Sequence, residues 1–164
     1  MTASNRHPLA TLSQLLSQEL AVAGDLLQVL DHERDALTRE DPQGIEATTM
    51  DKQQLMVQLR ELLTRRDAFL MERGYSTGKP GMDAILKELA ADLSDDTQTL
   101  WQSLGQVAGK LRDSNDTNGI LVSLAQRQTR QALEILTGRT GQQQTYGPGG
   151  NQVAGVSAQT LAKV

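Results

Sequence analysis

The sequence predicts an all-α protein: an elongated antiparallel coiled-coil hairpin, a third long helix and a flexible C-terminal tail. Two observations indicate this fold class. Leucines recur at alternating intervals of three and four residues through most of the first 69 positions and again from position 100. This 3.5-residue spacing keeps one stripe of a helix facing a partner helix. Only four of the 164 residues are aromatic, fewer than a compact α/β or β domain of this size normally buries.

The first two helices are expected over about 8–38 and 42–73, separated by a break at Asp41-Pro42. Proline suits the first turn of a helix, and the aspartate side chain can accept hydrogen bonds from the free amides there. Gly74 fits the left-handed position that ends a helix. Because the connection is short, the two helices must run antiparallel.

Charged residues inside the two leucine stripes predict the register of this hairpin. If the numbers of facing residues add to 85, Glu33 meets Lys52 and Glu19 meets Arg66. A shift of one heptad would leave these charges unpaired in the seam, at a cost of several kcal/mol for each buried charge. The sequence therefore predicts the register in which both pairs form.

A loop is expected over 74–81, which holds three glycines and a proline. A short amphipathic helix follows at about 82–91, with Met82, Ile85, Leu86 and Leu89 on one side. The last helix is expected over about 94–137, after the helix-starting Ser94-Asp95-Asp96.

Within this last helix, 113–119 has the composition of a loop, and two alternatives remain open. Either a loop divides two helices, or one helix carries a polar layer at Ser114 and Asn118. The apolar spacing continues in phase through the stretch, which favours one helix. Gly105 and Gly109 form a smooth strip that the hairpin could approach closely.

Residues 1–138 are expected to form the helical bundle and residues 139–164 a flexible tail, because glycine and polar residues dominate the tail. The tail nevertheless keeps residues typical of a segment that docks onto a partner: Tyr146, Val153, Val156 and Leu161. On the last helix, Asn118, Leu121 and Ala125 are further candidates for partner contacts.

Composition and charge exclude several classes of function. The net charge of −4 disfavours binding to nucleic acid. No cysteine is present, so disulfides and thiolate metal sites are excluded. Polar residues interrupt the leucines after position 8, so we expect neither a signal peptide nor membrane insertion, and a cytoplasmic location.

No catalytic, cofactor-binding or metal site is expected. His32 and Asp35 share a helix face, but two ligands do not make a metal site, and a solvated face is favoured. A phosphotransfer role for His32 is a further alternative, although the residues after it lack the lysine and glycine of such modules. The sequence therefore does not predict an enzyme.

Several motifs occur in an order typical of one family: Glu19, Glu33-x-x-Ala36-Leu37, Lys52 and Leu55 in the hairpin, then Leu100-Trp101, Asn115-x-x-Asn118-Gly119-Ile120-Leu121, and Tyr146-Gly147-Pro148-x-Gly150 in the tail. With them, the chain resembles the FlgN flagellar export chaperones. The resemblance implies a cytoplasmic protein that binds the C-terminal helical segments of hook-associated proteins of the FlgK and FlgL type. Such a protein prevents their premature assembly and delivers them to the flagellar type III export gate.

The resemblance also implies that the C-terminal part of the chain holds the client, and that Tyr146 contacts a gate protein of the FlhA type. The alternative is a structural coiled-coil adaptor of a larger complex that releases no client. Whether the chain forms a homodimer is left open.

Overall fold

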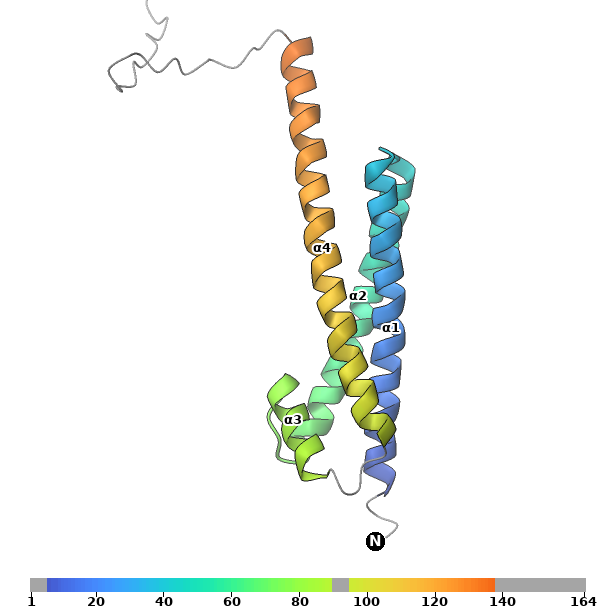
Figure 1. Cartoon of the computed structure of the whole chain (residues 1–164), viewed down its shortest axis with the longest axis vertical. Coiled ribbons are helices and arrows are strands. Elements are labelled where there is room, and N and C mark those ends of the chain that lie inside the picture. The colour runs from blue at the N-terminus through green and yellow to red at the C-terminus, as the bar shows by residue number, and fades with distance from the viewer. Residues whose placement is uncertain (1–5, 90–94, 138–164) are drawn as a thin grey trace, which may run out of the picture. The chain divides into compact units, whose positions relative to one another are not determined.

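The computed structural model describes residues 6–89 and 95–137, and this part of the chain is helical without strands (Figure 1). Its four helices are α1 (Arg6–Thr38), α2 (Pro42–Met71), α3 (Gly78–Glu88) and α4 (Asp95–Leu136). The predicted all-α class is therefore confirmed. The chain divides into two compact units, with the boundary between Leu124 and Ala125 inside α4.

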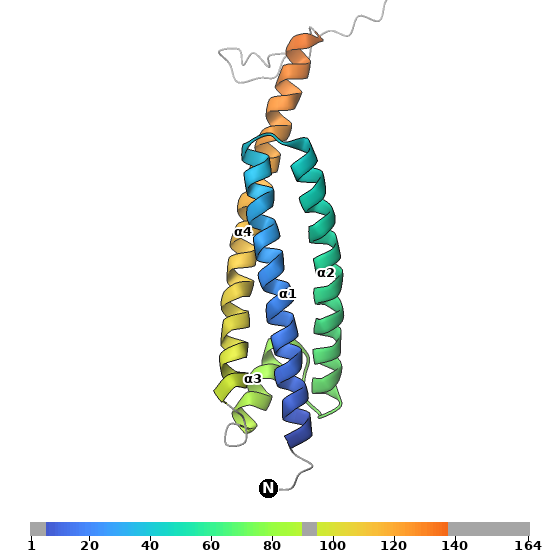
Figure 2. The ribbon, with the colours of Figure 1, turned by 90° about the vertical axis from the view of Figure 1, so that its right-hand side faces the viewer.

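Helices α1 and α2 form an antiparallel hairpin (Figure 2), and two ion pairs show that it has the predicted register. Arg66 Nη1 donates a hydrogen bond to Glu19 Oε2 at 2.6 Å. Lys52 Nζ donates one to Glu33 Oε1 at 2.5 Å. Both ion pairs join residues whose numbers add to 85, so the register deduced from charge pairing is confirmed.

The turn between α1 and α2 differs from the prediction in one detail. Asp41 is the N-cap residue and Pro42 opens the helix, as expected, but the Asp41 side chain makes no capping hydrogen bond. Its carboxylate lies against Gly44 instead, where an added Cβ would come within 2.5 Å of Asp41 Oδ2. At the other end of α2, Gly74 adopts the expected left-handed conformation, with φ +82°.

Helix α3 begins at Gly78, so the expected loop over 74–81 is shorter than predicted. The residues that open α3 make contacts that the local sequence does not indicate. The Gly78 amide donates a hydrogen bond to Asp67 Oδ1 of α2 at 2.9 Å, and Gly81 is packed so tightly that an added Cβ would lie 1.6 Å from the Ser76 carbonyl oxygen. These two glycines are therefore required for reasons other than a loop: Gly78 has φ +70°, and Gly81 is in close contact with Ser76.

The first unit has one apolar core, to which all four helices contribute. Its buried members are Leu12, Leu16, Ala23, Phe69, Leu70, Met82, Ile85 and Leu104. Leu86 of α3 and Leu89, the residue that caps its C-terminal end, pack against this cluster, which confirms the predicted apolar side of the short helix. The helix α3 thus covers one end of the hairpin.

Helix α4 runs in the same direction as α1 and continues through 113–119 without interruption (Figure 1). Of the two alternatives, the single helix with a polar layer is therefore confirmed. The close approach expected at Gly105 and Gly109 is wrong, because a Cβ added at either glycine would meet no atom within 4 Å. The hairpin contacts other residues of α4.

Candidate functional site

A polar layer joins the middle of α4 to α1. Asn118, which is only 3% exposed, donates hydrogen bonds to the Leu30 carbonyl and to Glu33 Oε2, each at 2.8 Å. Its amide oxygen accepts a hydrogen bond from Arg34 Nε at 3.3 Å, and Arg34 Nη2 donates another to Ser114 Oγ at 2.8 Å. The buried polar side chains of Ser114 and Asn118 thus find their hydrogen-bond partners on α1.

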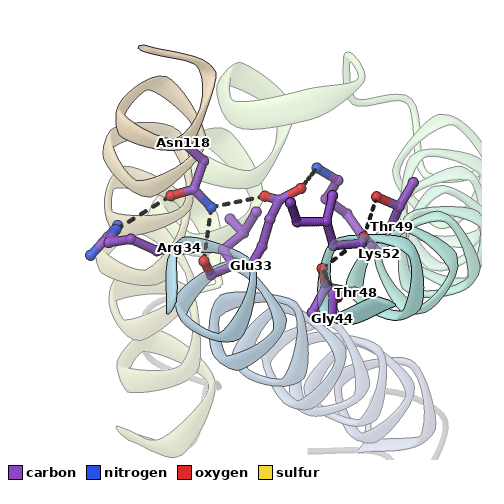
Figure 3. A network of polar contacts seen from close by, with 9 residues as sticks. Glu33, Arg34, Gly44, Thr48, Thr49, Lys52 and Asn118 are labelled. Atoms are coloured by element: carbon purple, nitrogen blue, oxygen red, sulfur yellow. Dashed lines mark hydrogen bonds and ion pairs between the residues drawn. The ribbon is translucent and has the colours of Figure 1, made fainter. Parts of the chain in front are cut away.

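The same layer reaches α2 through the carboxylate of Glu33. Figure 3 shows the Glu33 side chain between the Asn118 amide and the Lys52 ammonium group, and both donate hydrogen bonds to it. Glu33 is 5% exposed. One buried carboxylate therefore connects all three long helices.

A second buried pair lies nearer the other end of the hairpin. Glu19 is fully buried, and this burial raises its pKa to about 7, although the Arg66 charge acts in the opposite direction. The Arg66 guanidinium lies over the Trp101 ring of α4, 5.3 Å from its centroid. Trp101 Nε1 donates a hydrogen bond to Asp83 Oδ1 of α3 at 3.2 Å. These contacts link all four helices.

An open groove of about 730 Å³ lies beside this second pair. Its apolar surface comes from α1, α2 and α4 and its charged rim from α3. The lining residues include Ala23 of α1; Leu59 and Leu63 of α2; Lys79 and Asp83 of α3; and Trp101, Leu104, Gly105, Ala108 and Leu111 of α4. Glu19 and Arg66 also line it, so the groove combines apolar walls with one buried ion pair.

The apolar seam of α4 changes character along the helix. Up to Leu121 its members are buried or half-buried: Leu100, Leu104, Val107, Leu111, Ser114, Asn118 and Leu121. In the second unit the same spacing continues with exposed residues: Ala125, Gln128, Ala132 and Ile135. Ile135 is 76% exposed and Leu133 55%. A seam pattern of this kind normally faces another helix.

The structure places the predicted partner-binding residues differently from one another. Ala125 is exposed and Leu121 half-buried, whereas Asn118 is buried and its amide is bonded to α1. The tail candidates, Tyr146, Val153, Val156 and Leu161, lie outside the described residues. A contact with a partner stays a prediction for all seven residues.

Sequence reasoning did not locate the groove at these residues. The signal that could have indicated it is the pair Gly105 and Ala108, small residues that α4 exposes next to its apolar seam. Of the two glycines, Gly105 lines the groove and Gly109 does not, and a Cβ added at either would meet no atom of the hairpin within 4 Å.

Metal-binding clusters and membrane-spanning helices are absent from the described residues. Over 6–89 and 95–137, no three residues of the types that bind metal ions come together. His32 is exposed on α1. Among the helices in these ranges, none is both long and apolar enough for a membrane span.

The protein is all-α and has two apolar surfaces: the groove and the exposed part of the α4 seam. Both are suited to binding helices of other proteins. The family model described as FlgN protein matches residues 8–154, and the chain belongs to the FlgN family. It is therefore a flagellar export chaperone that binds flagellar proteins. Searches among curated proteins and among solved structures found no match.

Proposed function

We propose that this chaperone binds the C-terminal helical segments of hook-associated proteins of the FlgK and FlgL type in the cytoplasm. It prevents their premature assembly and delivers them to the flagellar type III export gate. The single observation that supports this most is the seam of α4, which continues in phase from Leu121 to Ile135 while its residues become exposed. A client helix takes the position that a partner helix would otherwise fill.

The physical basis is helix-on-helix recognition without catalysis. Burial of one leucine or isoleucine side chain contributes roughly 1.5–3 kcal/mol before the cost of association. Leu133 and Ile135, which are 55% and 76% exposed on α4, can therefore supply roughly 3–6 kcal/mol of the gross binding free energy, which is part of what a releasable complex needs.

We assign delivery to the tail. In this proposal residues 1–138 form the bundle, and residues 139–164 form a separate segment that acts at the export gate. Its apolar and aromatic residues lie within a glycine-rich stretch with no core of its own. Tyr146 contacts the gate protein of the FlhA type, and Val153, Val156 and Leu161 support that contact or the hold on the client.

The proposal is tested with the purified full chain and peptides from the C-terminal helical segments of hook-associated proteins. Ala125→Asp and Ile135→Asp should each weaken peptide binding about tenfold or more, because a charge on the seam must be desolvated in the complex. Gln126→Asp, also exposed on α4, is the matched control and should change the affinity little.

Two results would contradict the proposal. One is a wild-type chain that binds none of the peptides. The other is equal binding by the Asp variants and the Gln126→Asp control. Tyr146→Ala should leave peptide affinity unchanged and reduce export of the client from cells; loss of peptide binding in this variant would reassign Tyr146 to the client site.

A further inference from the structure

The groove beside the Glu19–Arg66 pair belongs to the first unit, and none of its lining residues is part of the exposed seam of the second unit. On α4 its wall extends from Trp101 to Leu111, which corresponds to roughly 15 Å of helix at about 1.5 Å per residue. Gly105 and Ala108 make this wall low, whereas Leu59 and Leu63 make the facing wall apolar. A groove with these walls fits a helix of about three turns, whose backbone can approach α4 closely at Gly105.

The charges around the groove are paired among themselves. Arg66 is paired with Glu19, and Lys79 at the rim is paired with Asp83 on the same helix. A helix with a charged inner face would therefore meet no free opposite charge among these four side chains. An apolar and uncharged face complements the groove.

Two polar atoms at the groove lack a hydrogen bond. Among the described residues, Glu19 Oε1 and Arg66 Nε are buried and have no hydrogen-bond partner. The side chains that carry them are 0% and 8% exposed. Buried polar atoms are nearly always paired, and an unpaired one costs roughly 1–3 kcal/mol. One atom accepts and the other donates, so a side-chain amide can satisfy both at once.

We infer that this groove is a second contact site for the client and holds a three-turn amphipathic helix that carries one side-chain amide among its apolar residues. The amide oxygen accepts a hydrogen bond from Arg66 Nε, and the amide nitrogen donates one to Glu19 Oε1. Because both atoms are covered in the free chain, the side chains around them must shift before the amide reaches them. This inference rests on the proposed function, since the occupant is a client helix.

The state of Glu19 suits this role. With a pKa raised to about 7 by burial, its carboxyl group exchanges readily between the protonated and ionised forms near neutral pH. The ionised form accepts a hydrogen bond from the amide nitrogen, which is the arrangement proposed. Binding of the amide therefore favours ionised Glu19.

The test compares two glycines on the same helix. Gly105 lines the groove and Gly109 does not, yet an added Cβ meets no atom within 4 Å at either position. Gly105→Leu should fill the groove and weaken binding of the client peptide about tenfold. Gly109→Leu should bind as wild type does. Neither variant should lose stability, because leucine favours a helix more than glycine does.

Trp101 supplies a second measurement, since it is the only tryptophan of the chain and lines the groove. A client peptide without tryptophan should shift Trp101 fluorescence to shorter wavelength in the wild type and in Gly109→Leu, but not in Gly105→Leu. Replacing the asparagines and glutamines of the peptide by leucine, one at a time, should weaken binding at one position.

The outcomes separate the two proposals. If the wild type binds no client peptide, the proposed function fails and this inference fails with it. If Gly105→Leu and Gly109→Leu bind alike, or if no amide of the peptide matters, only the groove assignment is overturned. If Gly105→Leu binds the client more tightly than the wild type does, the groove is normally occupied by another segment of the same chain, which competes with the client. If the molecular mass of Gly105→Leu in solution differs from that of the wild type, the groove is occupied by a second copy of the chain. Either result would also overturn the inference.

Discussion

The two helices that flank α1 are attached to it by different chemistry. Helix α2 is joined by leucines and by two ion pairs, Glu19–Arg66 and Glu33–Lys52. Helix α4 is joined by apolar contacts at its start and by the Asn118 amide farther along. Only one register of α2 against α1 brings both pairs of opposite charges together, so the ion pairs determine how the two helices align. The interface of α4 with α1 combines apolar packing with uncharged polar groups of α4: the Asn118 amide, bonded to a carbonyl, a carboxylate and Arg34, and the Ser114 hydroxyl, bonded to Arg34.

This difference has a consequence for function. Every seam residue of α2 from Thr48 to Phe69 is buried or half-buried against α1, so the hairpin has little seam to offer a partner. Helix α4 is covered only as far as Leu121 on its seam, and the groove next to Gly105 is open. The hairpin seam is therefore mostly covered, although Leu59 and Leu63 of α2 line one side of the groove, whereas α4 exposes its own seam beyond Leu121.

The largest loss of stability is expected when the Glu19–Arg66 ion pair is broken, because it is buried more deeply than Glu33–Lys52. Arg66→Met leaves Glu19 buried without its partner and should destabilise the protein by about 3–5 kcal/mol at pH 8. The double variant Glu19→Leu/Arg66→Met removes both charges and should recover most of this loss. Urea unfolding of the three chains measures both effects, and a double variant as unstable as the single one would show that the pair does not account for the loss.

A pH-dependent effect follows from the same pair. Burial raises the pKa of Glu19 from 4.5 to about 7; Arg66 lowers it and Asp67 of α2 raises it slightly. Between these two pH values the folded chain holds the Glu19 proton more tightly than the unfolded chain does. Its contribution to the free energy of unfolding is therefore greatest below pH 4.5 and decreases as the pH rises to 7.

Glu19→Gln removes this contribution while it keeps a side chain of the same shape. Relative to Glu19→Gln, the wild type should lose up to about 3 kcal/mol of unfolding free energy between pH 4.5 and pH 8. Denaturant unfolding of both chains across this range gives the difference directly. A difference that does not change with pH would contradict the raised pKa.

The register and the polar layer could be predicted because each depends on contacts between elements that the sequence already defines. The alternation of leucines with Glu19, Glu33, Lys52 and Arg66 leaves one arrangement without unpaired charge. The phase of the α4 seam across Ser114 and Asn118 likewise does not depend on the rest of the fold. Both predictions are confirmed by the contacts described above.

The start of α3 and the groove could not be predicted in the same way. Gly78 and Gly81 have the composition of a loop, but α3 already begins at Gly78, whose amide is bonded to Asp67 of α2, and Gly81 lies against the Ser76 carbonyl. The groove exists because α2 and α4 flank α1 and face each other across it, a property of three helices together. A pattern along one helix does not contain that information.

The smallest loss of stability is expected when the polar layer between α4 and α1 is disrupted at Asn118. Asn118→Leu removes the hydrogen bonds to the Leu30 carbonyl and to Glu33 and should destabilise the protein by about 1–2 kcal/mol, because the buried carbonyl loses its side-chain donor. Asn115→Leu, at an exposed position of the same helix, is the matched control and should change stability by less than about 0.5 kcal/mol. The two variants also separate attachment from folding, since hydrogen exchange of α4 amides should increase in Asn118→Leu more than exchange in α1 and α2. Equal loss of protection in all three helices would mean that α4 and the hairpin unfold as one cooperative unit, and that the amide contributes to the whole first unit.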